Sequence, residues 1–146
     1  MLFTNKKACQ NILGWDRKVQ TDDKASGHIN FAPTFDDNFN WNLDRLTAAQ
    51  FYLDQRTAGF TVKMAGQAAT RLYNGLCDYP DADQLTVVQI ENGSASIMPA
   101  DKIDLASGFV SGGYLATALL IDVRNLRTRV QRAIEADAAV IGARGE

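Results

Sequence analysis

The side chains best suited to chemistry in this sequence are four arginines crowded into nine positions near the C-terminal end: Arg124, Arg127, Arg129 and Arg132. Guanidinium groups favour planar, bidentate partners such as carboxylate or phosphate. The cluster is therefore a candidate contact for an acidic protein surface. Nucleic acid is a weaker candidate, because the net charge of the chain is −2. A solvated helix face, favoured near a helix C-terminus by the macrodipole, would explain the same residues without any partner.

The remaining reactive side chains form no catalytic motif. His28 is the only histidine, and neither Cys9 nor Cys77 has a His or Asp partner near it in the sequence. Asp44 and Asp54 could be imagined as an acid–base pair. Carboxylates are, however, common on helix starts and helix faces. We therefore expect a protein that is not an enzyme and that uses no cofactor.

One oxygen-rich stretch could hold a metal ion. Asp36, Asp37, Asn38 and Asn40 offer the carboxylate and amide oxygens that Ca²⁺ prefers. The glycine and the terminal bidentate glutamate of an EF-hand loop are missing. A turn followed by a strand is the preferred interpretation, and we expect no metal site.

The longest pattern in the chain is an apolar seam with alternating steps of three and four residues, interrupted only by Asp137. Its members are Phe109, Gly112, Ala116, Leu119, Val123, Leu126, Val130, Ala133 and Val140. On a helix this spacing gives one narrow stripe, which packs lengthwise against another helix. The pattern predicts a helix over about residues 114–140, divided from a shorter piece by Gly112 and Gly113.

The partner of this seam is either another helix of the same chain or a neighbouring copy. The predicted helix would be about 40 Å long, which exceeds what a compact domain of this size needs. We therefore assign part of the seam to an interface between subunits. The residues assigned are Leu119, Val123, Leu126 and Val130.

A second long helix is predicted from Thr47, which begins a capping box with Gln50, to about Leu76. A bend is expected near Gly59. Asp101 is the expected N-cap of the final helical region.

A hairpin is predicted between the two long helices. Residues 85–91 and 94–98 flank Asn92 and Gly93, the preferred pair for a two-residue type I′ turn. In that register one face of the hairpin would carry Val88, Ile90, Ala95 and Ile97.

The N-terminal third is predicted to be mostly extended. Trp41 alternates with polar neighbours, which is the pattern of a strand with one buried face. Aromatic side chains on such a segment commonly dock into a groove, on the same chain or on another. Phe35, Phe39 and Trp41 are accordingly candidate interface residues.

Composition fits one soluble domain: 146 residues, of which 46% are hydrophobic and 22% charged. The N-terminus lacks the apolar run of a secretory signal. The charge-free residues 105–121 fall short of the roughly 20 that a membrane helix requires. We expect a cytoplasmic protein with no membrane contact, which could be incorporated in a virion.

The predicted fold is α+β, mainly α: two long helices packed together, a β-hairpin between them and an extended N-terminal arm. Residues 1–17 would form a short helix, residues 18–44 the extended arm, and residues 45–146 a helix–hairpin–helix core, all within one domain.

Such an architecture favours a non-enzymatic structural or assembly subunit of a homo-oligomer or larger particle, for example a virion or phage head, connector or tail component. Its partners would be other copies of itself and other protein subunits. The alternative is a small ligand-binding or enzymatic domain with a pocket between the long helices and the hairpin. The polar candidates for that pocket are His28, Asp54, Arg56 and Tyr73.

Overall fold

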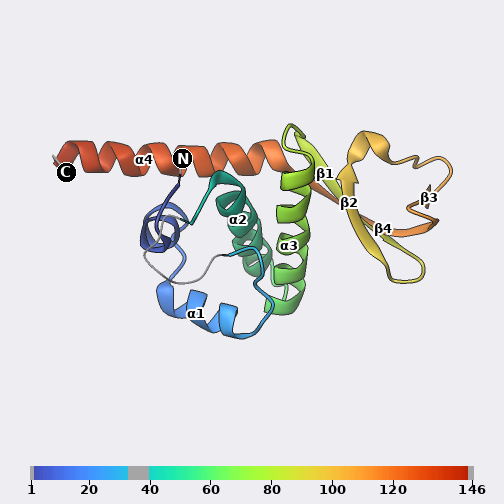
Figure 1. The fold of residues 1–146 in the computed structure, drawn as a ribbon, viewed down its shortest axis with the longest axis horizontal. Coiled ribbons are helices and arrows are strands. Elements are labelled where there is room, and N and C mark those ends of the chain that lie inside the picture. The colour runs from blue at the N-terminus through green and yellow to red at the C-terminus, as the bar shows by residue number, and fades with distance from the viewer. Residues whose placement is uncertain (1, 33–39, 145–146) are drawn as a thin grey trace.

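The chain folds into a body of helices from which a curled antiparallel sheet projects (Figure 1). The computed structural model describes residues 2–32 and 40–144, and side chains as far as residue 138. The elements in chain order are η1 (Lys7–Ile12), α1 (Arg17–Ala25), α2 (Leu43–Thr57), α3 (Val62–Asp78), β1 (Gln84–Ile90), β2 (Ala95–Pro99), η2 (Ala100–Lys102), β3 (Phe109–Val110), β4 (Gly113–Asp122) and α4 (Val123–Arg144).

The predicted α+β class is confirmed, but the prediction of a lone hairpin is wrong. The sheet has four strands in the order β2-β1-β4-β3, all neighbours being antiparallel. A two-stranded hairpin is marginal in water. The added strand β4 pairs with β1 along the whole of β1, from Gln84 to Ile90.

The predicted helix over residues 114–140 is also wrong in its first third, which is strand β4. Pairing with β1 decides this segment, because the spacing of a short apolar run does not by itself separate strand from helix. Helix α4 begins only at Val123, where the Asp122 carboxylate accepts a hydrogen bond of 3.0 Å from the Asn125 amide. Asp101, the predicted N-cap, lies in η2 instead.

The predicted helix from Thr47 to Leu76 is two helices. The bend expected at Gly59 is a complete break, since Gly59 has a φ of +100° and α3 restarts at Val62. The N-cap of α2 is Asn42, whose side chain accepts from the Arg45 amide at 2.9 Å. Thr47 forms no capping box: its hydroxyl donates to the Leu43 carbonyl at 2.7 Å, inside the helix.

The extended arm predicted for residues 18–44 is helical over α1. Asp16 caps this helix by accepting from the amides of Lys18 and Val19. Trp41 keeps the expected extended form, through two backbone hydrogen bonds with Phe3 of 2.8 and 3.0 Å.

A buried polar cluster fixes the N-terminal part of the body. The Asn5 carboxamide oxygen accepts from the Gln20 side chain at 3.0 Å and from the Trp41 indole at 3.1 Å. Gln20 also donates to the Cys9 sulfur at 2.8 Å. Because burial raises the pKa of the Cys9 thiol to about 12, this cysteine stays protonated and unreactive at neutral pH.

The hairpin lies where the sequence predicts it, with a different register. The Ile90 amide bonds to the Ser94 carbonyl at 3.0 Å, so the turn has three residues, and Gly93 has the positive φ of +89°. Val88 therefore faces Ser96 rather than Ile97. This one-residue change moves the β2 side chains to the opposite face of the sheet.

The two faces of the sheet have different neighbours. Leu85 and Ile121 point toward the helices and belong to the main core. Ile97, on the same face, fits against Gly75 of α3, where an added Cβ would lie 2.8 Å from its Cδ1. The other face buries Val88 and Ile90 inside the curl of the sheet.

Helix α4 runs along the helical body in Figure 1. Near its far end the carboxylate of Asp137 forms an ion pair with Lys7 and accepts from Asn11 at 3.3 Å. This contact with the N-terminal segment explains the one interruption of the apolar seam. None of the helices within residues 2–32 and 40–144 has both the length and the apolar content needed to cross a membrane.

Two glycines of α3 test the packing of this body. An added Cβ at Gly66 would lie 2.3 Å from the His28 carbonyl oxygen, whereas at Gly75 the near atoms all belong to the Ile97 side chain, Cδ1 at 2.8 Å being the nearest. We expect Gly66→Ala to lower the free energy of unfolding by about 1–3 kcal/mol. Gly75→Ala should lower it less, since Ile97 can shift and alanine favours the helix by about 1 kcal/mol. Urea unfolding would measure both, and equal losses would contradict the backbone contact at Gly66.

Candidate functional site

The predicted interface residues are distributed unevenly between core and surface. Val123, Leu126 and Val130 are buried in the core of the single chain, as in the alternative that the seam packs on its own subunit. Trp41 is fully buried as well. Leu119 is exposed on strand β4, with 40% of its surface accessible.

Two further predicted interface residues, Phe35 and Phe39, lie outside the described residues. The oxygen-rich stretch from Asp36 to Asn38 lies outside them too. In the described part of the chain, no group of three or more His, Cys, Asp or Glu side chains is arranged to hold a metal ion.

The four arginines separate into two that bind the chain itself and two on the surface. Arg129 forms a bidentate pair with Asp54, both N–O distances being 2.7 Å. Arg127 donates to the Pro80 carbonyl at 2.9 Å, which fixes the loop after α3. Arg124 and Arg132 are exposed. An anionic partner would therefore meet two separate guanidinium groups on α4 rather than a cluster of four.

The exposed apolar side chains of the projecting sheet form a candidate interaction site. The sheet residues Phe109, Tyr114, Leu119 and Leu120, each between 40% and 59% exposed, are here named the distal apolar surface. Large exposed apolar side chains grouped on one part of a protein typically mark an interaction site.

The strand register determines how these four side chains are presented. Phe109 pairs with Tyr114 across β3 and β4, and their rings meet edge to face at 5.6 Å. Leu119 pairs with Val87 and so lies on the helix-facing side of the sheet. Leu120, the next residue, points to the opposite side. The distal apolar surface is thus divided between the two faces of the sheet along β4.

Strand β4 also has an unpaired edge. Its neighbour β3 is two residues long and pairs only with Gly113 and Tyr114, and the Leu115 amide bonds to the Gly108 carbonyl at 2.7 Å. Beyond that point, residues 117–121 pair with β1 on one side and with no described strand on the other. Exposed apolar edges of this kind are templates for pairing with another chain, and proteins ordinarily cover or charge them.

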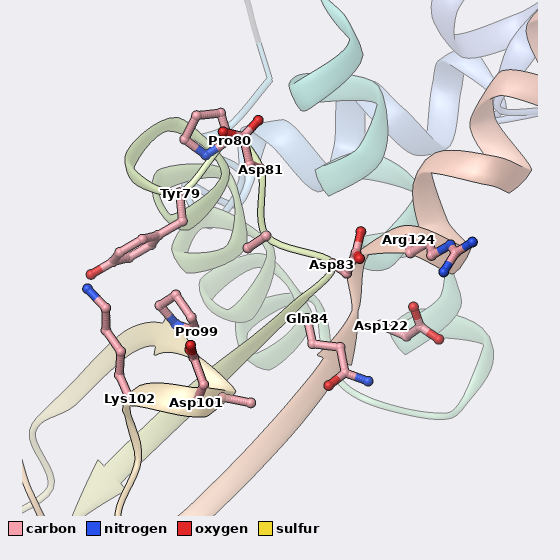
Figure 2. A pocket seen from close by; sticks show the side chains of 12 residues that line it. Tyr79, Pro80, Asp81, Asp83, Gln84, Pro99, Asp101, Lys102, Asp122 and Arg124 are labelled. Atoms are coloured by element: carbon pink, nitrogen blue, oxygen red, sulfur yellow. The ribbon is translucent and has the colours of Figure 1, made fainter.

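A polar groove lies at the base of the sheet, with a volume of about 810 Å³ (Figure 2). Four carboxylates and two cations line it, together with Tyr79: Asp81, Asp83, Asp101, Asp122, Lys102 and Arg124. The Lys102 ammonium sits 5.0 Å from the centre of the Tyr79 ring. The groove lies between the C-terminal end of α3, the hairpin and the start of α4.

The polar residues predicted for a pocket lie elsewhere. Asp54 pairs with Arg129, and the Arg56 side chain donates to the Phe60 carbonyl at 2.7 Å. Tyr73 lies under the Arg45 guanidinium, 5.7 Å from its ring centre. His28 contributes its backbone carbonyl to the contact with Gly66.

Sequence reasoning missed Phe109, Tyr114 and Leu120 as site residues because it placed them in a helix. A signal was nevertheless present: Ser111 and Gly112 form a Ser-Gly dipeptide, which commonly marks a turn. Both residues have positive φ values and form the turn between β3 and β4.

A scan against protein-family models finds no match to this chain, and a search of curated proteins finds no relative.

The Arg129–Asp54 pair can be separated experimentally from the exposed arginines. We expect Arg129→Ala to lower the free energy of unfolding by about 1 kcal/mol, since the pair is bidentate but partly exposed. Arg132→Ala is the matched control and should change it little. A double-mutant cycle with Asp54→Ala measures the coupling; a coupling energy of zero would contradict the pair.

Proposed function

We propose that this protein is a non-enzymatic structural or assembly subunit of a homo-oligomer or larger particle, such as a virion or phage head, connector or tail component. The observation that carries the proposal is the distal apolar surface beside the unpaired edge of β4. Its partners would be other copies of the chain and other protein subunits.

Burial of these side chains would contribute substantially to association. A large apolar side chain that becomes fully buried contributes roughly 1.5–3 kcal/mol. Phe109 and Tyr114 are more than half exposed and are already held against each other, so little side-chain entropy remains to be lost on binding. The distal apolar surface therefore suits a contact with another protein.

The arrangement of the molecule supports contacts on more than one side. The sheet projects from one end of the helical body, while α4, about 33 Å long from its 22 residues, runs along the body (Figure 1). The exposed Arg124 and Arg132 offer a separate contact for acidic groups. A particle subunit that touches several neighbours requires surfaces of different chemistry in this way.

Native mass, measured by light scattering behind a sizing column, tests this function. We expect a mass above the 16.0 kDa of one chain that persists at high salt, because the contact is apolar. Phe109→Ser combined with Tyr114→Ser should lower the mass. Met64→Ser, at an equally exposed residue on α3, is the control and should not. A wild-type monomer at every concentration would contradict the proposal.

The groove of Figure 2 favours a second candidate function, the binding of a small ligand. Its volume lies within the roughly 300–1,000 Å³ typical of ligand pockets. An excess of carboxylates along the groove suits a ligand that carries positive charge.

Mass spectrometry after denaturation tests this second candidate. If the groove binds a ligand, the purified protein should release a small molecule. The Asp83→Asn variant should lose this molecule, whereas Asp16→Asn, which changes a carboxylate outside the groove, should retain it. Release of the same molecule from both variants would rule the groove out as its site.

A further inference from the structure

We infer that two copies of this chain join through the open edge of β4, pairing residues 117–121 antiparallel about a two-fold axis into one continuous sheet. This inference rests on the proposed assembly function. It identifies the partner as a second copy of the chain and specifies the register of the strand pairing. It uses the backbone of β4 in addition to the exposed side chains of Leu119 and Leu120.

The direction of the backbone groups on β4 follows from the hairpin. The Ile90 amide bonds to Ser94 on the β2 side, so by alternation Gln89 and Val87 direct their backbone groups toward β4. Their partners Thr117 and Leu119 point back at β1.

The residues between these partners, Ala118 and Leu120, therefore direct their N–H and C=O groups to the open side. Both residues are exposed, which agrees with an uncovered edge. A second strand placed there would find donors and acceptors at the spacing of an antiparallel ladder.

The limits of the free edge define the register. The bond from Leu115 to Gly108 closes it at one end, and α4 begins at Val123 at the other. The middle of the interval is Leu119. In a two-fold antiparallel pair centred there, Leu119 faces its own copy in a non-hydrogen-bonded position. Ala118 then exchanges both backbone hydrogen bonds with Leu120 of the second chain.

The side chains permit this self-pairing. No charged residue lies between Gly113 and Ile121, so the two strands bring no like charges together. Opposite Leu119 side chains would cover each other on the helix-facing side. A two-fold pair also closes on itself, whereas pairing with a different edge of another copy would continue into a chain or ring.

The other edge of the sheet is less open. The Ser111 hydroxyl lies 3.1 Å from the Ser96 hydroxyl, which brings the β3–β4 turn against β2 and curls the sheet. The β4 edge is therefore the better site for a second copy.

Cysteine cross-linking tests the register directly. The exposed Cys77 would first be replaced by serine, while the buried Cys9 remains. Opposed residues at a non-hydrogen-bonded position have Cα atoms about 4.5 Å apart, within the range of about 4.4–6.8 Å that a disulfide spans. Leu119→Cys should therefore give a covalent dimer under mild oxidation, and Met64→Cys, similarly exposed on α3, should give none.

A backbone variant complements the cross-link. Ala118→Pro removes one outward N–H and leaves the groups that point at β1 in place. We expect its native mass to fall by at least half, with the circular dichroism of the folded protein retained. Should this variant unfold, Leu120→Lys, with Met64→Lys as control, places a charge at the edge and should give the same loss.

The outcomes separate this inference from the proposed function. A wild-type oligomer that is neither cross-linked through Leu119→Cys nor dissociated by Ala118→Pro or Leu120→Lys would overturn β4 pairing and leave the assembly function standing. A wild-type monomer would overturn both. Cross-linking equal to that of Met64→Cys would mean random collision and would also overturn the pairing.

Discussion

The apolar junction between the helical body and the projecting sheet is the contact on which the rest of the structure depends. Leu85 and Ile121 pair across β1 and β4 at the base of the sheet, and Val123 follows at once in α4, all three nearly inaccessible to solvent. The Asp122 carboxylate caps α4 between them, so strand passes into helix without a loop. Ile97, set against Gly75, holds the hairpin on the same side. Because the junction ends at Ile121, the preceding residues of β4 leave the core and reach the surface.

That transition accounts for the character of the candidate site. Within one residue the chain changes from the buried Ile121 to the exposed Leu120, and the exposed residues Ala118, Leu119 and Leu120 are all apolar. Proteins ordinarily place charge or proline on such an edge. Leu119 and Leu120 instead lie exposed beside the open edge of β4, which is the observation behind the proposed pairing with a second chain.

The sequence was sufficient for the class of fold and for the position of the hairpin, and insufficient for the path of the chain after it. Gly93 marks the turn because a positive φ is required there. The number of turn residues, however, depends on the hydrogen bond between Ile90 and Ser94, which the Asn92-Gly93 dipeptide does not specify. The three-four spacing from Phe109 to Leu119 resembled a helix, and only pairing with β1 makes it a strand. The prediction that Leu119 lies in an interface stays a prediction, supported by the exposure of its side chain. Trp41 was recognised as an anchor, but its partner, the Asn5 carboxamide, lies 36 positions earlier and has no local signal.

Amide hydrogen exchange along β4, measured in concentrated and in dilute solution, tests the central claim most directly. The account predicts that the amides of Thr117 and Leu119, which point at β1, are protected in both solutions. Those of Ala118 and Leu120 should be protected only in the concentrated one, where a second copy supplies acceptors. Equally fast exchange of Ala118 and Leu120 in an oligomer and in a monomer would contradict assembly through this edge.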